Sequence, residues 1–148
     1  MRREDIDEGR YALRLMLDLA LYGNGTCISL RDISARQNVS VKYLEQIVVI
    51  LARAGFVKSV RGPQGGYRLA RPPKDYTAGE ILRLIEGSLA PVPCLEDDTN
   101  SCPRSAECAT VVLWSRLNQA ISGVVDGMTL EDLAVIQRSK VDEAKDGM

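Results

Sequence analysis

The chain has 148 residues, and its 45% hydrophobic and 26% charged residues are ordinary for one soluble globular domain. It contains no histidine, which excludes Ser-His-Asp triads, Cys-His dyads and the His-Glu-x-x-His zinc motif. We expect a cytoplasmic protein, because we find neither a signal peptide nor the roughly 18-residue apolar run of a membrane span. The net charge of −1 is unevenly divided, because residues 1–75 hold 13 Lys/Arg and 8 Asp/Glu while residues 76–148 hold 6 and 12, and we expect only the first half to contact a polyanion.

Three helices are predicted in the first 54 residues. The first covers residues 10–22, and its apolar stripe comprises Ala12, Leu15, Met16 and Leu19. Ser29 begins a second, short helix that runs to about Gln37, and Ser40 begins a third that ends before Gly55. The tight turn between the second and third helices matches the helix-turn-helix pattern, although many helical hairpins of this kind are only packing units.

A hairpin is predicted next, because two β-prone runs at residues 56–60 and 67–70 bracket a turn rich in glycine and proline. The turn differs from a nucleotide-binding P-loop, since it lacks the Gly-Lys-Ser/Thr ending and leads into a strand. Arg61 lies at its tip, and further basic residues flank it. A basic hairpin directly after a helix-turn-helix is typical of a wing, whose glycines let the backbone lie close to DNA phosphates.

The second half is predicted to be helical around one long loop. Thr77 and Glu80 form a capping box that begins a helix ending at Gly87. After a loop at residues 88–104, we expect the longest helix from about residue 106 to 125, then a last short helix after Thr129, and a charged tail that frays from Ser139. The apolar stripe of the long helix comprises Leu113, Leu117, Ile121 and Val124.

Three of the four cysteines, Cys94, Cys102 and Cys108, are clustered, which in a reducing compartment indicates a metal or redox site rather than disulfides. Thiolates bind both zinc and iron–sulfur clusters. The wide spacings on a proline-containing loop favour a cluster, and zinc, a reactive thiol site or three metal-free cysteines are the alternatives. Cys27 stands alone after a glycine turn, and we expect it to be a small buried hydrophobe.

Over residues 1–136 the chain resembles the Rrf-two family of winged-helix regulators, typified by IscR and NsrR. The motifs that carry the likeness are Gly-Arg-Tyr-Ala at residues 9–12, Tyr-Leu-Glu-Gln at 43–46, Val-Arg-Gly-Pro-Gln-Gly-Gly-Tyr at 60–67, the cysteine triplet, Leu-Trp at 113–114 and Thr-Leu-x-Asp-Leu at 129–133. The wing motif is highly specific, and the combination of motifs is more specific still.

The resemblance implies a mainly α fold. We expect a winged helix-turn-helix DNA-binding region with a two-stranded β wing over residues 1–75, a cysteine loop and a long dimerisation helix over residues 76–136, and a charged tail over residues 137–148. The implied assembly is a homodimer on double-stranded DNA. Two recognition helices would lie in successive major grooves of a pseudo-palindromic operator, with the wings along the minor groove, and Trp114 would belong to the dimer core.

The DNA contacts are expected at the start of the third helix and in the wing. Tyr43, Glu45 and Gln46 would reach base edges, because glutamine can bond adenine and a carboxylate can accept from cytosine. Ser40 and Lys42 would hold phosphates; a merely solvated helix face is the alternative. The expected wing contacts, with the arginine in a narrow minor groove, are Arg61, Gly62, Pro63, Gln64 and Gly65.

For members with the cysteine triplet, the resemblance also implies an iron–sulfur cluster that switches DNA binding, here a 2Fe–2S cluster on Cys94, Cys102 and Cys108. The chain departs from IscR, whose first cysteine gap is shorter and whose fourth ligand is a histidine at the position that Val111 occupies here. In NsrR-like relatives a carboxylate of the partner subunit completes the site. We therefore expect Glu8, and after it Asp7, as the fourth ligand; the alternative is that these acids only favour the positive end of the first helix.

The expected function is sequence-specific, cluster-dependent regulation of transcription, as a repressor or an activator, without enzymatic activity. The signal would be iron–sulfur status, redox state or nitric oxide. One alternative is a cluster-free family member controlled by a partner protein or a small molecule. Another is a thiol redox enzyme with Cys94 or Cys102 as nucleophile, which the missing histidine disfavours although a helix N-terminus near Cys108 could lower a thiol pKa.

Overall fold

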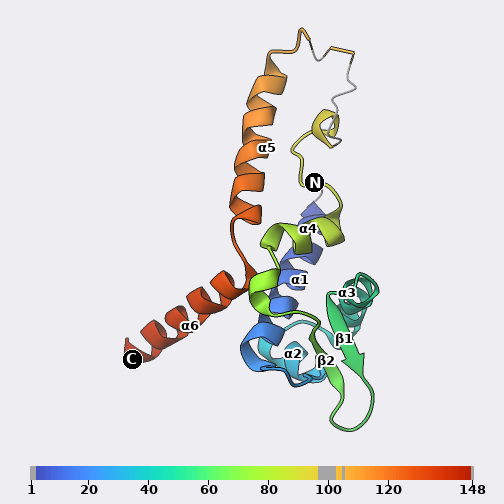
Figure 1. The fold of residues 1–148 in the computed structure, drawn as a ribbon, viewed down its shortest axis with the longest axis vertical. Helices are drawn as coiled ribbons and strands as arrows, with labels where there is room; N and C mark the ends of the chain where they lie inside the picture. The colour runs from blue at the N-terminus through green and yellow to red at the C-terminus, as the bar shows by residue number, and fades with distance from the viewer. Residues whose placement is uncertain (1–2, 97–102, 105, 148) are drawn as a thin grey trace.

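The computed structural model describes residues 3–96, 103–104 and 106–147, with side chains described from Glu8 onward in these ranges. Its elements in chain order are α1 (Arg3–Tyr22), α2 (Leu30–Gln37), α3 (Val41–Arg53), β1 (Val57–Val60), β2 (Gly66–Leu69), the 3-10 turn η1 (Pro73–Asp75), α4 (Ala78–Glu86), the 3-10 turn η2 (Pro93–Leu95), α5 (Thr110–Asp126) and α6 (Leu130–Asp146). Figure 1 shows a body built around α1, from which α5 and α6 project in different directions. The fold is mainly α with a two-stranded antiparallel sheet, as predicted.

Helix α1 is the centre of the core. The predicted stripe is confirmed, because Ala12, Leu15, Met16 and Leu19 are at most 2% exposed. The helix begins at Arg3, seven residues before the predicted start, and at 20 residues it is longer than α5. The prediction of α5 as the longest helix was therefore wrong. The first turns of α1 are rich in acidic residues, and carboxylates stabilise the N-terminal end of a helix, which carries partial positive charge. These turns have no apolar periodicity, so the pattern that predicted the rest of the helix did not reveal them.

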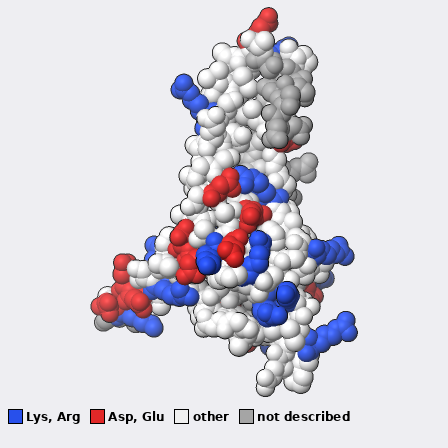
Figure 2. Space-filling view, in the orientation of Figure 1, with Lys and Arg blue, Asp and Glu red and all other residues white. Residues whose placement is uncertain are grey.

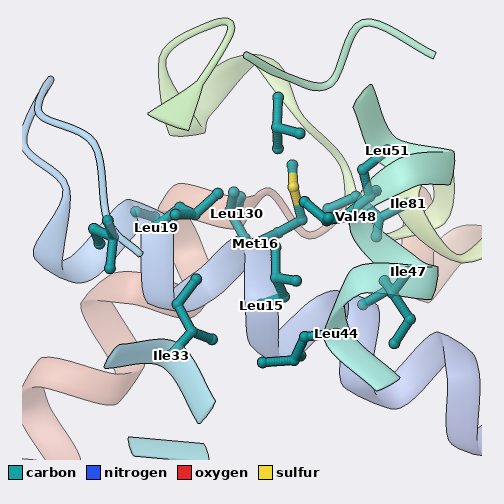
Figure 3. Packing of buried hydrophobic residues seen from close by; sticks show 14 of the residues in the cluster. Leu15, Met16, Leu19, Ile33, Leu44, Ile47, Val48, Leu51, Ile81 and Leu130 are labelled. Carbon is teal, nitrogen blue, oxygen red and sulfur yellow. The ribbon is translucent and has the colours of Figure 1, made fainter. Parts of the chain in front are cut away.

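The helix-turn-helix is confirmed as α2 and α3. The Ser29 hydroxyl accepts from the Asp32 amide, and Asn38 ends α2 in the left-handed conformation with φ of 54°. The inward side of α3 packs on α1 in one hydrophobic core (Figure 3). Its buried residues are the four expected ones, Leu44, Ile47, Val48 and Leu51.

The wing is confirmed as an antiparallel hairpin in which Val57 pairs with Leu69 and Val60 with Gly66. A further bridge joins β2 to the segment before α2, since the amides of Ile28 and Tyr67 each donate to the other residue's carbonyl at 2.8 Å. Gly66 makes this approach possible. Its φ is +146°, and a Cβ there would collide with the Ile28 carbonyl. The wing is thereby attached to the helix-turn-helix.

Replacing Gly66 by Ala is expected to destabilise the protein, by about 1–3 kcal/mol from backbone strain alone and further through the collision. Gly62→Ala is the matched control, because Gly62 also has a positive φ, +114°, but has nothing within 4 Å of an added Cβ. Urea unfolding followed by circular dichroism at one protein concentration measures both losses. A loss for Gly66→Ala no larger than that for Gly62→Ala would show that the bridge to Ile28 does not constrain the wing.

Tyr76 anchors the segment that leaves the wing, and sequence reasoning missed it. Its side chain is fully buried, and its hydroxyl donates to the Phe56 carbonyl at 2.6 Å while accepting from the Arg71 amide at 3.0 Å. The ring of Phe56 packs edge-on against it at 5.6 Å between centroids. Residues 71–75, which include η1, are thus tied to the core.

In the second half, the capping box at Thr77 and Glu80 is confirmed, as is the end of α4 at Gly87. A bidentate ion pair of Arg83 with Asp126, at 2.5 and 3.0 Å, joins α4 to the end of α5. The predicted frayed tail is wrong: α6 continues to Asp146, and the good helix formers in this segment are Lys140, Glu143, Ala144 and Lys145. Within the described ranges, no helix has the length and apolar character to cross a bilayer.

Candidate nucleic-acid interface and cysteine loop

One face of α3 presents polar side chains to solvent. Lys42, Glu45 and Gln46 are exposed, opposite the buried stripe of the same helix. Tyr43 is half-buried instead, because its ring meets the ring of Tyr11 in an edge-on contact at 5.5 Å. Three of the four predicted side chains inside α3 are therefore accessible, and Tyr43 also serves to join α3 to α1.

The start of α3 is fixed by Ser40, whose hydroxyl oxygen accepts from the Tyr43 amide at 3.1 Å. The cap uses the oxygen as acceptor and leaves the hydroxyl proton available to donate, which is what a phosphate contact requires. Basic side chains lie next to this end of the helix: the guanidinium groups of Arg10 and Arg14 lie 5.7 and 5.4 Å from the centroid of the Tyr11 ring. Sequence reasoning did not include these arginines in the site.

The position of α2 depends on a buried carboxylate that sequence reasoning also missed. Asp18 on α1 is fully buried and accepts from Arg36 at 2.7 and 2.9 Å and from Gln37 at 3.0 Å. The hydrogen bond to Asp18 raises the pKa of Arg36. This network orients the end of α2, and hence the turn into α3, because both partners of Asp18 lie in the last turn of α2. The sequence signal for this network is an aspartate among the apolar positions of the first helix.

The wing loop stands clear of the body (Figure 1). Arg61, Gly62, Pro63 and Gln64 are exposed, and Gly65 is half-buried. Gly65 is needed for close backbone packing, since a Cβ there would collide with the Val60 carbonyl. The predicted wing residues therefore form one accessible loop.

Charge follows the same division. On the face drawn in Figure 2, Lys and Arg side chains surround the lower body near α3 and the wing, while Asp and Glu side chains gather over α6 and the middle of the molecule. The net charge of residues 1–75 is positive. The polar face of α3 and the wing thus lie in the part of the chain suited to a polyanion.

Two variants separate phosphate contacts from base readout on α3. Lys42→Ala is expected to weaken binding to all DNA sequences and to lower the salt slope of log K by about 1 per contacted phosphate. Glu45→Ala is expected to reduce the discrimination between the preferred base pair and the others, a difference of about 1–3 kcal/mol per base pair. The overall affinity is expected to fall little, because the carboxylate repels phosphates. Binding-site selection and salt titrations of anisotropy measure the two effects. An unchanged selected sequence for Glu45→Ala would contradict the assignment.

Two of the three clustered cysteines are described, and both are half-buried; Cys102 lies outside the described residues. Cys94 is on η2, which packs against the side of α5. Cys108 precedes α5, and its sulfur lies 3.1 Å from the Thr110 hydroxyl oxygen. That hydrogen bond, with smaller effects of the Val111 and Thr110 backbone and of Arg104, lowers the pKa of Cys108. A lowered pKa favours the thiolate, which is the form that binds metals.

The donor chemistry of this loop suits an iron–sulfur cluster, because its three thiols are the ligands that such clusters take. Among the described residues, no three cysteine or acid side chains converge on one point. Leu95, next to Cys94, lies in a hollow beside Asn118, which is about 12 Å along the helix axis from Thr110. Cys94 thus lies next to a residue that faces the middle of α5, whereas Cys108 precedes the first turn of that helix.

The apolar stripe of α5 is largely exposed. Leu113, Leu117 and Val124 expose 59%, 42% and 65% of their surfaces, and Ile121 and Trp114 are half-buried. Exposed aliphatic side chains at this spacing along one helix are typical of a helix–helix interface.

Cys27 is half-buried, so the prediction that it is a buried hydrophobe was wrong. It directly follows the surface turn at residues 23–26, and the chain becomes buried only at the next residue, Ile28.

Comparison with known proteins decides the family. The family model Rrf2, described as "Iron-dependent Transcriptional regulator", matches residues 7–135. The chain belongs to the Rrf2 family. The expected family membership and winged-helix fold are thereby confirmed, and the chain is a transcriptional regulator of the Rrf2 type.

Relatives within the Rrf2 family are similar over most of their length. The regulator CymR of Bacillus subtilis is 45% identical over 128 residues, which cover 86% of each chain. The structure of this CymR, a global cysteine regulator, matches with a TM-score of 0.74 and 40% identity over 87% of this chain and 94% of that one. IscR of Aliivibrio salmonicida is 40% identical over 86% of this chain and 75% of its own. The structure of T. potens IscR matches with a TM-score of 0.69 and 40% identity over 85% and 82%.

Proposed function

We propose that this Rrf2 regulator binds a pseudo-palindromic operator as a homodimer, with α3 of each subunit in the major groove and each wing along the minor groove. The observation that carries the proposal is the exposed polar face of α3 beside an exposed, glycine-shaped wing in the net-positive part of the chain. The exposed stripe of α5 supports pairing of two copies. Binding-site selection from random duplexes tests the proposal, and recovery of no inverted repeat would reject it.

We further propose that Cys94, Cys102 and Cys108 hold a 2Fe–2S cluster, which would supply a signal sensitive to iron–sulfur status, redox state or nitric oxide. Support comes from the three thiols of one loop, the lowered pKa of Cys108 and the similarity to IscR proteins. The loop joins α4 to α5, so a change in the loop's conformation would change the position of α5. Coupling of the cysteine site to DNA binding is then expected to be about 1–3 kcal/mol.

The fourth ligand is proposed to be a carboxylate near the start of the partner's α1. Glu8 is exposed on α1, whereas the side chain of Asp7 lies outside the described residues. Glu8→Ala and Asp7→Ala are each expected to shift the visible spectrum of the cluster-loaded protein and to shorten its lifetime in air. Glu143→Ala, which removes an exposed acid of α6, is the control. Wild-type spectra and lifetimes for both variants would assign the fourth position to another ligand.

A cluster-free regulator is the second candidate, and the similarity to B. subtilis CymR favours it. The visible spectrum of anaerobically purified protein distinguishes the two: sulfur-to-iron charge-transfer bands mean a cluster, and a colourless, iron-free protein means regulation by a partner protein or small molecule. A thiol redox enzyme would instead turn over a thiol substrate, which we do not expect.

A further inference from the structure

A cavity of about 410 Å³ lies apart from both the DNA-binding face and the cysteine loop. It is open to solvent on one side and is lined by the turn that ends α1, by the end of β2 and the segment after it, and by α6. Four charged residues line it: Arg68, Arg71, Arg138 and Glu131. Its size is that of a small-molecule site.

The cavity carries an excess of positive charge. Arg138 is 3.9 Å from Glu131, which balances one arginine. Arg68 and Arg71 have no carboxylate within ion-pair distance among the described residues. Arg68 also lies directly across the sheet from Lys58, and like charges in opposed positions are destabilising. The wing therefore retains an unfavourable cluster of cations, which a bound anion would relieve.

Arg71 is held in place before any ligand arrives. Its guanidinium lies 4.4 Å from the centroid of the Tyr76 ring and 5.4 Å from that of Phe56. Its amide donates to the Tyr76 hydroxyl, which fixes the backbone as well. A cation ordered in this way loses less conformational entropy on binding.

The cavity is poorly placed for the DNA backbone. It lies at the end of β2 that is remote from the wing tip, and the four residues of that strand span about 13 Å. Glu131 and the negative C-terminal end of α1 also line it, and both repel a polyanion.

We propose that this cavity binds a small anionic metabolite with a carboxylate or phosphate group, anchored by Arg68 and Arg71. The planar guanidinium forms paired hydrogen bonds to either group. Because the cavity contacts both the strand of the wing and α6, a bound anion connects the DNA-binding region to the C-terminal helix. Occupancy is then linked to operator affinity, and the linkage is reciprocal.

Titration of the full-length, ¹⁵N-labelled protein without DNA tests the proposal, at constant ionic strength. Succinate and inorganic phosphate are the probes, and succinamide is the uncharged control. We expect saturable shifts of the amides of residues 23–26 and 68–71 with at least one anion and none with succinamide. A response to succinate alone assigns the carboxylate class, and a response to phosphate alone assigns the phosphate class.

Variants locate the site. Arg68→Gln is expected to weaken anion binding at least tenfold. Arg138→Gln is expected to weaken it as well, and this variant leaves the contacts of Arg71 with the core intact. Arg31→Gln, which removes an exposed arginine of α2 outside the cavity, is expected to change nothing. Absence of saturable shifts with both anions, or equal affinity in Arg68→Gln, overturns the proposal. None of these results depends on operator binding or on a cluster.

Discussion

Replacing Leu117 by Asp is expected to convert the proposed homodimer into monomers and to weaken operator binding by about 100-fold or more, because two linked half-site contacts become independent. Leu117 lies in the middle of the α5 stripe and is 42% exposed in the single chain, so the substitution adds no buried charge to the fold of one subunit. In a dimer the two aspartates would face each other in an apolar interface, where unpaired charges are strongly unfavourable.

Sedimentation and anisotropy measure the two effects on the same samples. Val135→Asp is the matched control, since Val135 is exposed to a similar degree on α6, outside the stripe. It is expected to remain dimeric and to bind the operator normally. A dimeric Leu117→Asp variant with full operator affinity would show that α5 is not the interface.

Replacing any one of Cys94, Cys102 or Cys108 by Ala is expected to abolish the visible absorbance of anaerobically purified protein, because three thiolates hold the proposed cluster together and two do not suffice. The dimer is expected to persist, since the stripe of α5 is apolar and separate from the thiols. Iron and sulfide content measured per chain quantifies the loss.

Cys27→Ala is the control for thiol chemistry in general. Cys27 is as half-buried as Cys94 and Cys108 but lies before α2, in the DNA-binding half. It is expected to keep the spectrum of the wild type. Equal absorbance in all four single variants would contradict a cluster on the loop. If a variant with Cys94, Cys102 and Cys108 all replaced by Ala were monomeric, the loop rather than the α5 stripe would hold the subunits together.

The local signals of the sequence were sufficient for most of the fold. Caps at Ser29, Ser40, Thr77 and Thr129 have short-range causes, and each begins a helix as predicted. The first two turns of α1 and the last two of α6 were missed for one reason. Both are rich in charge and lack apolar periodicity, so their helicity depends on propensity and end charges rather than on a buried stripe.

Long-range contacts explain what the sequence did not predict at the site. Asp18 binds residues 18 and 19 positions away, and Tyr76 bonds a carbonyl 20 positions earlier. No local pattern pairs such residues, although an acid among apolar helix positions, and a tyrosine after a Pro-Pro turn, mark them as unusual. The exposed polar face of α3 was predictable because both the cap and the periodicity of this helix are local.

The uncovered stripe of α5 has a consequence for gene dosage. If operator binding requires two copies of the chain, halving the number of chains in a cell where dimers dissociate lowers the dimer concentration about fourfold by mass action. Expression of the target genes would then respond more steeply than linearly to the supply of the regulator itself. A regulator that also represses its own gene would convert this steepness into a tightly held copy number.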